Sequence, residues 1–173
     1  MTVAQPHTLP PNPPPAGLAR RMASFLYEGV LLFGVVFTGG YFYSALTQQR
    51  HALQGHLGLQ IFLFLLLAIY FAWFWSHGGQ TVAMKAWHVR LIRRDGGQVS
   101  QPRAIARYLL CWLWFLPALL TVYLTGVSGV GNIFASLFAG VLAYALLSYL
   151  HPRRQFLHDA LCDTELIEQK PTT

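Results

Sequence analysis

Arg21 and Glu28 are the residues whose types and spacing could do chemistry inside a membrane. Glu28 is the one acidic residue within the predicted membrane spans, and Arg21 precedes it by seven positions. In a helix this spacing is almost two turns, so both side chains project from one face, about 10 Å apart along the axis. That separation is long for a direct ion pair. We expect Arg21 to reach lipid head groups or a carboxylate on another segment, and Glu28 to face the bundle interior.

Two roles are open for Glu28. Ionisable groups are costly in hydrocarbon and commonly functional there, so the carboxylate is a candidate proton or cation site. The alternative is a structural polar anchor, because Glu28 lies less than two helical turns from the expected membrane edge. The residue types alone leave both roles open.

No other residues have the spacing of a known catalytic or metal site. His77 and His88 are eleven positions apart, and His151 and His158 lie near the C-terminus. Cys111 and Cys162 fall on different elements. The sequence contains no phosphate-binding glycine loop, nucleophile elbow or metalloprotease helix. We therefore expect no metal, no cofactor, no disulfide and no enzymatic activity.

The elements that position these residues are apolar and long. The chain is 54% hydrophobic and 10% charged, whereas soluble domains carry about 25% charged residues. Residues 29–49, 57–84 and 108–152 contain no Asp, Glu, Lys or Arg. Each stretch exceeds the roughly 20 apolar residues that cross a bilayer core. Composition therefore predicts an integral membrane protein.

The expected fold is an all-α membrane protein, a bundle of four transmembrane helices. The stretch 108–152 is too long for one crossing, and Gly126, Ser128 and Gly129 mark a turn near its middle. The predicted spans are residues 22–46, 57–76, 108–125 and 131–150. Small residues recur every four positions in the last span, which predicts tight packing within the bundle, with a homodimer as the alternative. These residues are Gly131, Ala135, Ala139 and Ala143.

Lys and Arg residues gather on one side of this topology. Eleven of the twelve precede the first span, lie between the second and third, or follow the fourth, and only Arg50 lies on the other side. The positive-inside bias therefore places both termini and the long central loop in the cytoplasm. Because these residues flank apolar spans and form no face interleaved with aromatics, we expect no nucleic-acid partner. The basic residues of the loop are Lys85, Arg90, Arg93, Arg94, Arg103 and Arg107.

The remaining segments are shorter. In the cytoplasmic loop, alternating residues from Trp87 to Ile92 and the turn residues Asp95 to Gly97 before Val99 resemble a β-hairpin; an amphipathic loop on the head groups is the alternative. Residues 1–17 are rich in proline and predict a disordered leader. The predicted membrane domain covers residues 18–167, and a flexible tail covers 168–173.

Three segments together resemble the RDD family of small membrane proteins, over about residues 15–167. The first is PAGLARRMA at 15–23, leading to Glu28. The second combines GQT at 79–81, MK at 84–85 and VRLIRRDGG at 89–97. The third combines RRQ at 153–155, LHD at 157–159 and Thr164.

This resemblance implies functional roles for three charged residues. The family is named for an arginine at the start of its first helix, an aspartate within that helix and a second aspartate. The matching residues are Arg21, Glu28 and Asp159. Glu28 replaces the usual aspartate, and Ala83 stands where the pattern has glycine. The match suggests that Asp159 closes onto Arg21 and staples the last element to the first.

Two functions follow as hypotheses. The family resemblance implies transport of an unidentified ligand, with Glu28 as the membrane-embedded site and Arg21 with Asp159 as a cytoplasmic gate. The alternative is a non-catalytic scaffold or accessory protein whose basic loop binds a partner or anionic lipid. In both cases we expect a multi-pass protein of the bacterial cytoplasmic (inner) membrane. The expected partners are the lipid bilayer and either a second copy of the chain or another membrane protein.

Overall fold

The computed structural model describes residues 14–47, 56–126 and 129–169. Within these ranges, four helical segments are long and apolar enough to cross a membrane: Leu18–Leu46, Leu57–Ser76, Gln101–Thr125 and Val130–Leu150. The predicted all-α membrane fold is confirmed. Residues 1–13 of the predicted leader and 170–173 of the predicted tail lie outside the described residues.

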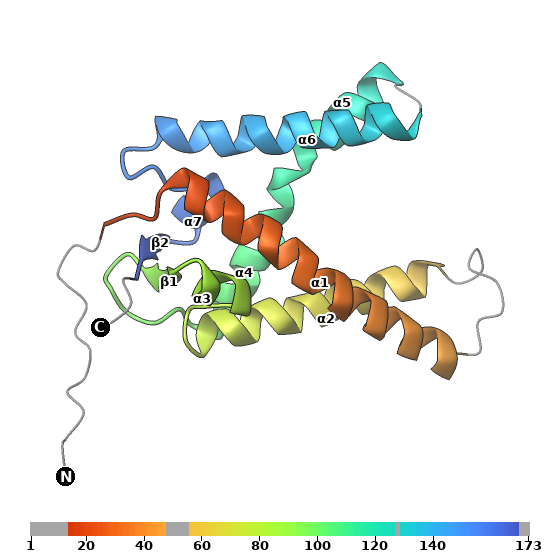
Figure 1. Ribbon diagram of the computed structural model, residues 1–173, viewed down its shortest axis with the longest axis horizontal. Coiled ribbons are helices and arrows are strands. Elements are labelled where there is room, and N and C mark those ends of the chain that lie inside the picture. Colours follow the sequence, from red (N-terminus) through yellow and green to blue (C-terminus); the bar gives the residue numbers. More distant parts are fainter. Residues whose placement is uncertain (1–13, 48–55, 127–128, 170–173) are drawn as a thin grey trace, which may run out of the picture.

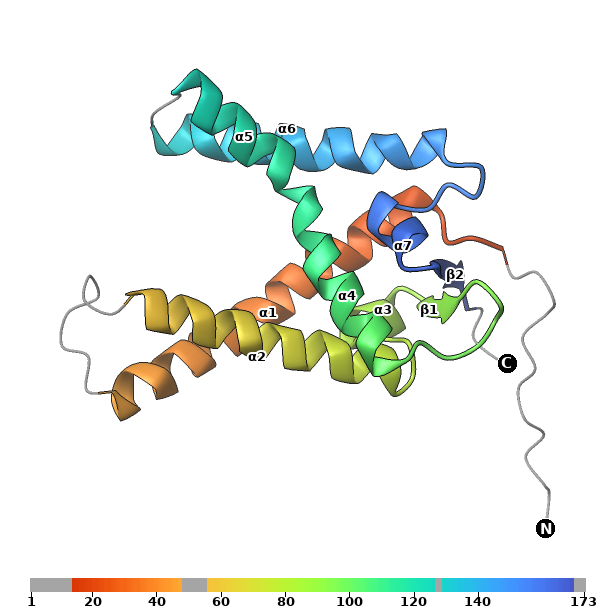
Figure 2. The ribbon, with the colours of Figure 1, turned by 180° about the vertical axis from the view of Figure 1, so that it is seen from behind.

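The spans form two helical hairpins joined by a helix that crosses between them (Figure 1). In the first hairpin, α1 (Leu18–Leu46) packs against α2 (His56–Ser76). In the second, α5 (Leu116–Thr125) packs against α6 (Val130–Leu147), which continues into the short 3-10 helix η2 (Ser148–Leu150). Figure 2 shows α4 running from the first pair toward the second.

The third span begins at Gln101 and not at the predicted Tyr108. It consists of α4 (Gln101–Cys111), the 3-10 turn η1 (Trp112–Trp114) and α5. The sequence prediction missed α4 because this helix is amphipathic. Its N-terminal half contains polar and charged residues, so it does not belong to a continuous apolar run. Pro117 near the start of α5 lacks the N–H that would continue the helix, which accounts for the break at η1.

Two short helices and two strands close one end of the molecule, here called the sheet end. They are α3 (Val82–Ala86), β1 (Val89–Arg93), α7 (Leu157–Leu161) and β2 (Thr164–Glu168). The strands pair antiparallel, with Leu91 opposite Leu166. The strand predicted in the central loop and a small antiparallel sheet are therefore present, but the partner of β1 comes from the C-terminal segment and not from residues around Val99.

The leader and tail predictions need correction where the chain is described. Pro15 forms a β-bridge with Ile167, and the Ala16 N–H donates to the Leu166 carbonyl. Ala16 is buried. Glu168, predicted as tail, belongs to β2. Residues 14–17 are therefore ordered along the edge of the sheet, since their backbone groups find partners in β2.

The buried core is concentrated at the sheet end. Leu91 and Leu166 from the sheet meet Tyr108 from α4 and Trp75 from α2 in one cluster. The outer faces of the spans instead expose large apolar side chains such as Phe33 and Phe138. This distribution suits helices surrounded by lipid, where apolar side chains need no burial.

The small-residue pattern of the last span does not pack inside the bundle. Gly131, Ala135, Ala139 and Ala143 are all exposed. The close approach of α6 to α5 occurs at Gly140, where a Cβ atom would lie 2.7 Å from Ala118 Cβ. Intramolecular packing through the predicted stripe is therefore wrong, because α6 presents a different face to α5.

Candidate functional site

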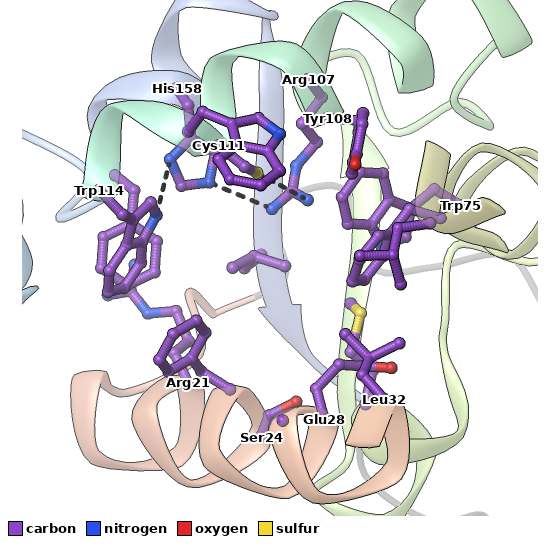
Figure 3. A pocket seen from close by; sticks show the side chains of 18 of the residues that line it. Arg21, Ser24, Glu28, Leu32, Trp75, Arg107, Tyr108, Cys111, Trp114 and His158 are labelled. Atoms are coloured by element: carbon purple, nitrogen blue, oxygen red, sulfur yellow. Dashed lines mark hydrogen bonds between the residues drawn. The ribbon is translucent and has the colours of Figure 1, made fainter. Parts of the chain in front are cut away.

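Arg21, Ser24 and Glu28 are the buried residues of α1. Their spacing of three and four places them on one helix face, as the sequence indicated for Arg21 and Glu28. This face looks toward α2, α4 and the sheet end (Figure 3). A helix that exposes many apolar side chains thus carries Arg21, Ser24 and Glu28 inward.

Glu28 is held by two hydroxyl groups from other elements. Tyr70 of α2 donates to Oε1 over 2.8 Å. The Thr81 hydroxyl donates to Oε2 and accepts from the Met84 N–H at 3.2 Å, so Thr81 also caps α3. Glu28 therefore ties α1 to α2 and to the start of α3.

Arg21 is only partly satisfied. Its Nη2 donates to the Arg154 carbonyl over 2.6 Å, and its guanidinium lies over the Phe156 ring at 4.7 Å. The residue is 4% exposed. Its Nε and Nη1 atoms have no hydrogen-bond partner among the described residues.

Asp159 forms its ion pair with Arg107 and not with Arg21. Arg107 Nε and Nη2 each lie 2.7 Å from Asp159 Oδ1, and both residues are buried. Arg107 also stacks over Trp75 at 4.2 Å. The expected staple between Arg21 and Asp159 is therefore replaced by one between α4 and α7, because α4 presents Arg107 directly to α7 while a backbone carbonyl holds Arg21.

The sequence analysis grouped Arg107 with the basic loop, yet the helical spacing around it could have placed it on the inner face of a helix. Ala104, Arg107, Tyr108 and Cys111 are spaced as one face of a helix. The structure buries Ala104, Arg107 and Tyr108, while Cys111 is half-buried. Arg107 thus belongs to the inner face of α4.

His158 lies next to this ion pair. Trp114 Nε1 donates to His158 Nδ1 at 3.2 Å, and the Tyr144 hydroxyl lies 3.0 Å from the same nitrogen. Because Nδ1 accepts the Trp114 N–H, the proton of the neutral ring lies on Nε2, which is 3.5 Å from both Asp159 Oδ1 and Arg107 Nη2. Burial lowers the pKa of His158 to about 4, so the imidazole is neutral at physiological pH.

The basic residues of the predicted loop are spread over folded elements and are largely paired. Lys85 lies in α3, Arg90 and Arg93 lie in β1, and Arg103 and Arg107 lie in α4. Their acidic partners come mainly from the C-terminal segment. The remaining ion pairs at the sheet end are Arg20–Glu168, Arg93–Asp95, Arg94–Glu165, Arg103–Asp163 and Arg153–Glu165.

A cavity of about 370 Å³ lies between α1, α2, α4 and the sheet end. Arg21, Ser24 and Glu28 line it from α1, and Arg107 and His158 line it from α4 and α7 (Figure 3). Asp159 contacts the last two residues without lining the cavity itself. Of the three predicted charged residues, Arg21 and Glu28 therefore line one cavity, and Asp159 pairs with Arg107 in the cavity wall.

The described residues contain no group of three or more His, Cys, Asp or Glu side chains that could hold a metal ion. Cys111 and Cys162 are free thiols. Burial raises the pKa of the Cys162 thiol. The polar groups that line the cavity include the side chains of Arg21, Ser24 and Glu28, with Arg107 and His158 on the opposite wall, and Trp75 Nε1, which has no hydrogen-bond partner among the described residues.

Comparison with known proteins agrees with this architecture. Residues 15–163 match the RDD family, which covers most of the chain and all four spans. No curated protein and no solved structure matches. With four apolar spans and a family match of this length, the chain belongs to the RDD family of membrane proteins.

Proposed function

We propose that this protein transports a small ligand or ion across the bacterial cytoplasmic membrane through the central cavity. The observation that carries the proposal is that Glu28, an ionisable residue inside the first membrane span, and Arg21, at the start of the same helix, line one cavity. Ionisable groups at membrane depth commonly mark ligand or ion pathways. A cavity of about 370 Å³ is in the size range of small-molecule sites.

Glu28 supplies an element that can switch. Its two hydrogen bonds hold α1 against α2 and α3. Hydrogen bonds to an ionised carboxylate are stronger than those to its neutral form. Binding or release of a proton at Glu28 would therefore change how firmly α1 is held at the cavity, which couples the carboxylate to opening.

The proposed orientation places the sheet end in the cytoplasm. The Lys and Arg residues of the described chain lie on the elements and loops of this end, from Arg20 to Arg154. The tip of the α5–α6 hairpin lies at the opposite side of the molecule, as do the C-terminal end of α1 and the N-terminal end of α2 (Figure 1). The positive-inside bias supports this orientation.

The alternative is a non-catalytic scaffold that binds a partner or anionic lipid through its basic residues. The ion pairs at the sheet end weaken this alternative. Arg94 and Arg153 both pair with Glu165, and Arg103 pairs with Asp163. These contacts leave fewer unpaired basic side chains for a partner or an anionic lipid to bind.

The test is ion and proton flux in proteoliposomes. Wild-type protein is compared with Glu28→Gln and Arg21→Gln after insertion and folding of each are verified. Glu168→Gln is the matched control, because it removes a carboxylate that pairs with Arg20 outside the cavity. We expect flux in the wild type and in Glu168→Gln, and its loss in Glu28→Gln. Absence of flux from every sample, across several ions and gradients, would favour the scaffold.

A further inference from the structure

Among the described residues, one positively charged side chain of the cavity lining, Arg21, forms no ion pair. Arg107 is neutralised by Asp159. Both oxygens of Glu28 accept hydroxyl donors, so this carboxylate is already satisfied by protein groups. His158 is buried and neutral. Arg21 remains, with its charge inside the protein and no ion pair among the described residues.

The unpartnered nitrogens of Arg21 need an acceptor. A buried donor without a partner costs about 1–3 kcal/mol, and more when it belongs to a charged group. The Arg154 carbonyl and the Phe156 ring account for Nη2 and one face of the guanidinium, but not for Nε and Nη1. Arg21 lines the cavity, so a molecule in the cavity can supply the acceptor.

The rest of the cavity wall is mostly apolar. Phe25, Leu32, Phe71, Met84 and Phe115 line it between the polar residues. Glu28 lies about 10 Å from Arg21 along the helix axis, so an anionic group placed at Arg21 makes no direct contact with its carboxylate. The lining therefore fits a molecule with one anionic group and an apolar body.

We propose that the cavity binds an anionic amphiphile, a carboxylate or phosphate head on an acyl chain, with the head at Arg21 and the chain between α1, α2 and α4. This inference rests on the proposed function and names the substrate class of the same cavity. The head group accepts hydrogen bonds from the unpartnered nitrogens of Arg21. Two sources present this chemistry, a free fatty acid and a membrane phospholipid.

Tryptophan quenching by brominated amphiphiles tests this proposal. Trp75, Trp112 and Trp114 line the cavity, whereas Trp73 and Trp87 are exposed elsewhere. The protein carries Trp73→Phe and Trp87→Phe and is placed in nanodiscs of neutral lipid. The probe is a medium-chain fatty acid brominated near its methyl end, and its brominated methyl ester is the uncharged comparison. We expect saturable quenching by the acid only.

Arg21→Gln should weaken this binding roughly tenfold or more, because it removes charged hydrogen bonds. Arg20→Gln is the matched control. It removes the neighbouring charge, which pairs with Glu168 outside the cavity, and should bind as the wild type does. A brominated phosphatidylglycerol in place of the acid distinguishes a phospholipid head from a free carboxylate. Equal quenching by acid and ester overturns the proposal, as does equal affinity in Arg21→Gln and Arg20→Gln.

A steric variant keeps the test decisive if Arg21→Gln does not fold. Gly29 lines the cavity and has open space where a Cβ would lie, and Gly34 has the same space outside the cavity. Gly29→Phe should lose the saturable quenching, and Gly34→Phe should keep it. Equal quenching in both overturns the proposal. Binding without flux of ions, protons or the acid itself would remove transport and keep this site, whereas flux without binding would remove this site alone.

Discussion

At the scale of single residues, hydroxyl groups determine how the carboxylate of α1 is held. Glu28 meets no arginine among the described residues, and Tyr70 and Thr81 supply its donors. Thr81 has a second role, because its oxygen also accepts the N–H of Met84 at the start of α3. One side chain thus links the buried carboxylate to the geometry of the segment that precedes β1.

Thr81→Val should therefore destabilise the protein by about 1–3 kcal/mol, since it leaves a Glu28 oxygen and a helix N-terminus without their partner. Thr81→Ser keeps the hydroxyl and should unfold near the wild-type temperature. Thermal unfolding in nanodiscs measures both. Equal unfolding temperatures for the two variants would contradict this role of Thr81.

His158 predicts a pH dependence of stability. Burial lowers its pKa from 6.5 to about 4, so between these values the unfolded chain binds a proton that the native protein does not. His158 therefore leaves the free energy of unfolding unchanged above pH 6.5 and lowers it as the pH falls toward 4. The loss at pH 5 should be about 2 kcal/mol.

His158→Gln should lack this part of the pH dependence in chemical denaturation, while His151→Gln should retain it. The same pH dependence in wild type and His158→Gln would show that His158 is not buried neutral.

At the scale of elements, the buried pair of Arg107 and Asp159 joins α4 to α7. Asp159→Asn leaves Arg107 buried without its counter-charge and should cost about 3–5 kcal/mol. Asp163→Asn makes the same chemical change in the more exposed pair with Arg103 and should cost about 0–1 kcal/mol. Denaturation curves compare the two. Similar losses would mean that the buried pair does not hold α7 in place.

The sequence predicted those elements whose signal is local. Long apolar runs indicated the four spans, and the spacing of Arg21 and Glu28 indicated that both lie on one helix face. The pairing of β1 with β2 was missed because register between distant strands depends on tertiary packing. Arg107 was missed for a related reason: α4 is amphipathic, and its acidic partner lies 52 residues away.

At the scale of the whole molecule, the sheet end and the far ends of the two hairpins lie on opposite sides of the molecule (Figure 1). Gln98, after β1, is exposed at the sheet end, and Val130 is exposed at the start of α6 on the opposite side. A membrane-impermeant thiol reagent should label Val130→Cys on intact cells and Gln98→Cys only after permeabilisation, in a background without native cysteines. The reverse labelling would invert the proposed topology.

The same scale shows what family membership contributes. The RDD match covers all four spans and includes Arg21, Glu28 and Asp159. The family pattern identifies these three charged residues as a group, but the packing of the helices determines which contacts each of them makes. Two of them line the cavity, and the third neutralises Arg107 in its wall. These three residues form no ion pair with one another among the described residues. What they share is the cavity and its wall.

The most direct test of transport through this cavity changes its width without touching a charge. Gly29→Phe places a ring at the cavity, and Gly34→Phe places the same ring five residues further along α1, outside it. Flux of ions and protons is measured in proteoliposomes of both variants and of the wild type. The account predicts that Gly29→Phe loses most of the wild-type flux and Gly34→Phe keeps it. Equal flux through both variants would contradict a path through the cavity.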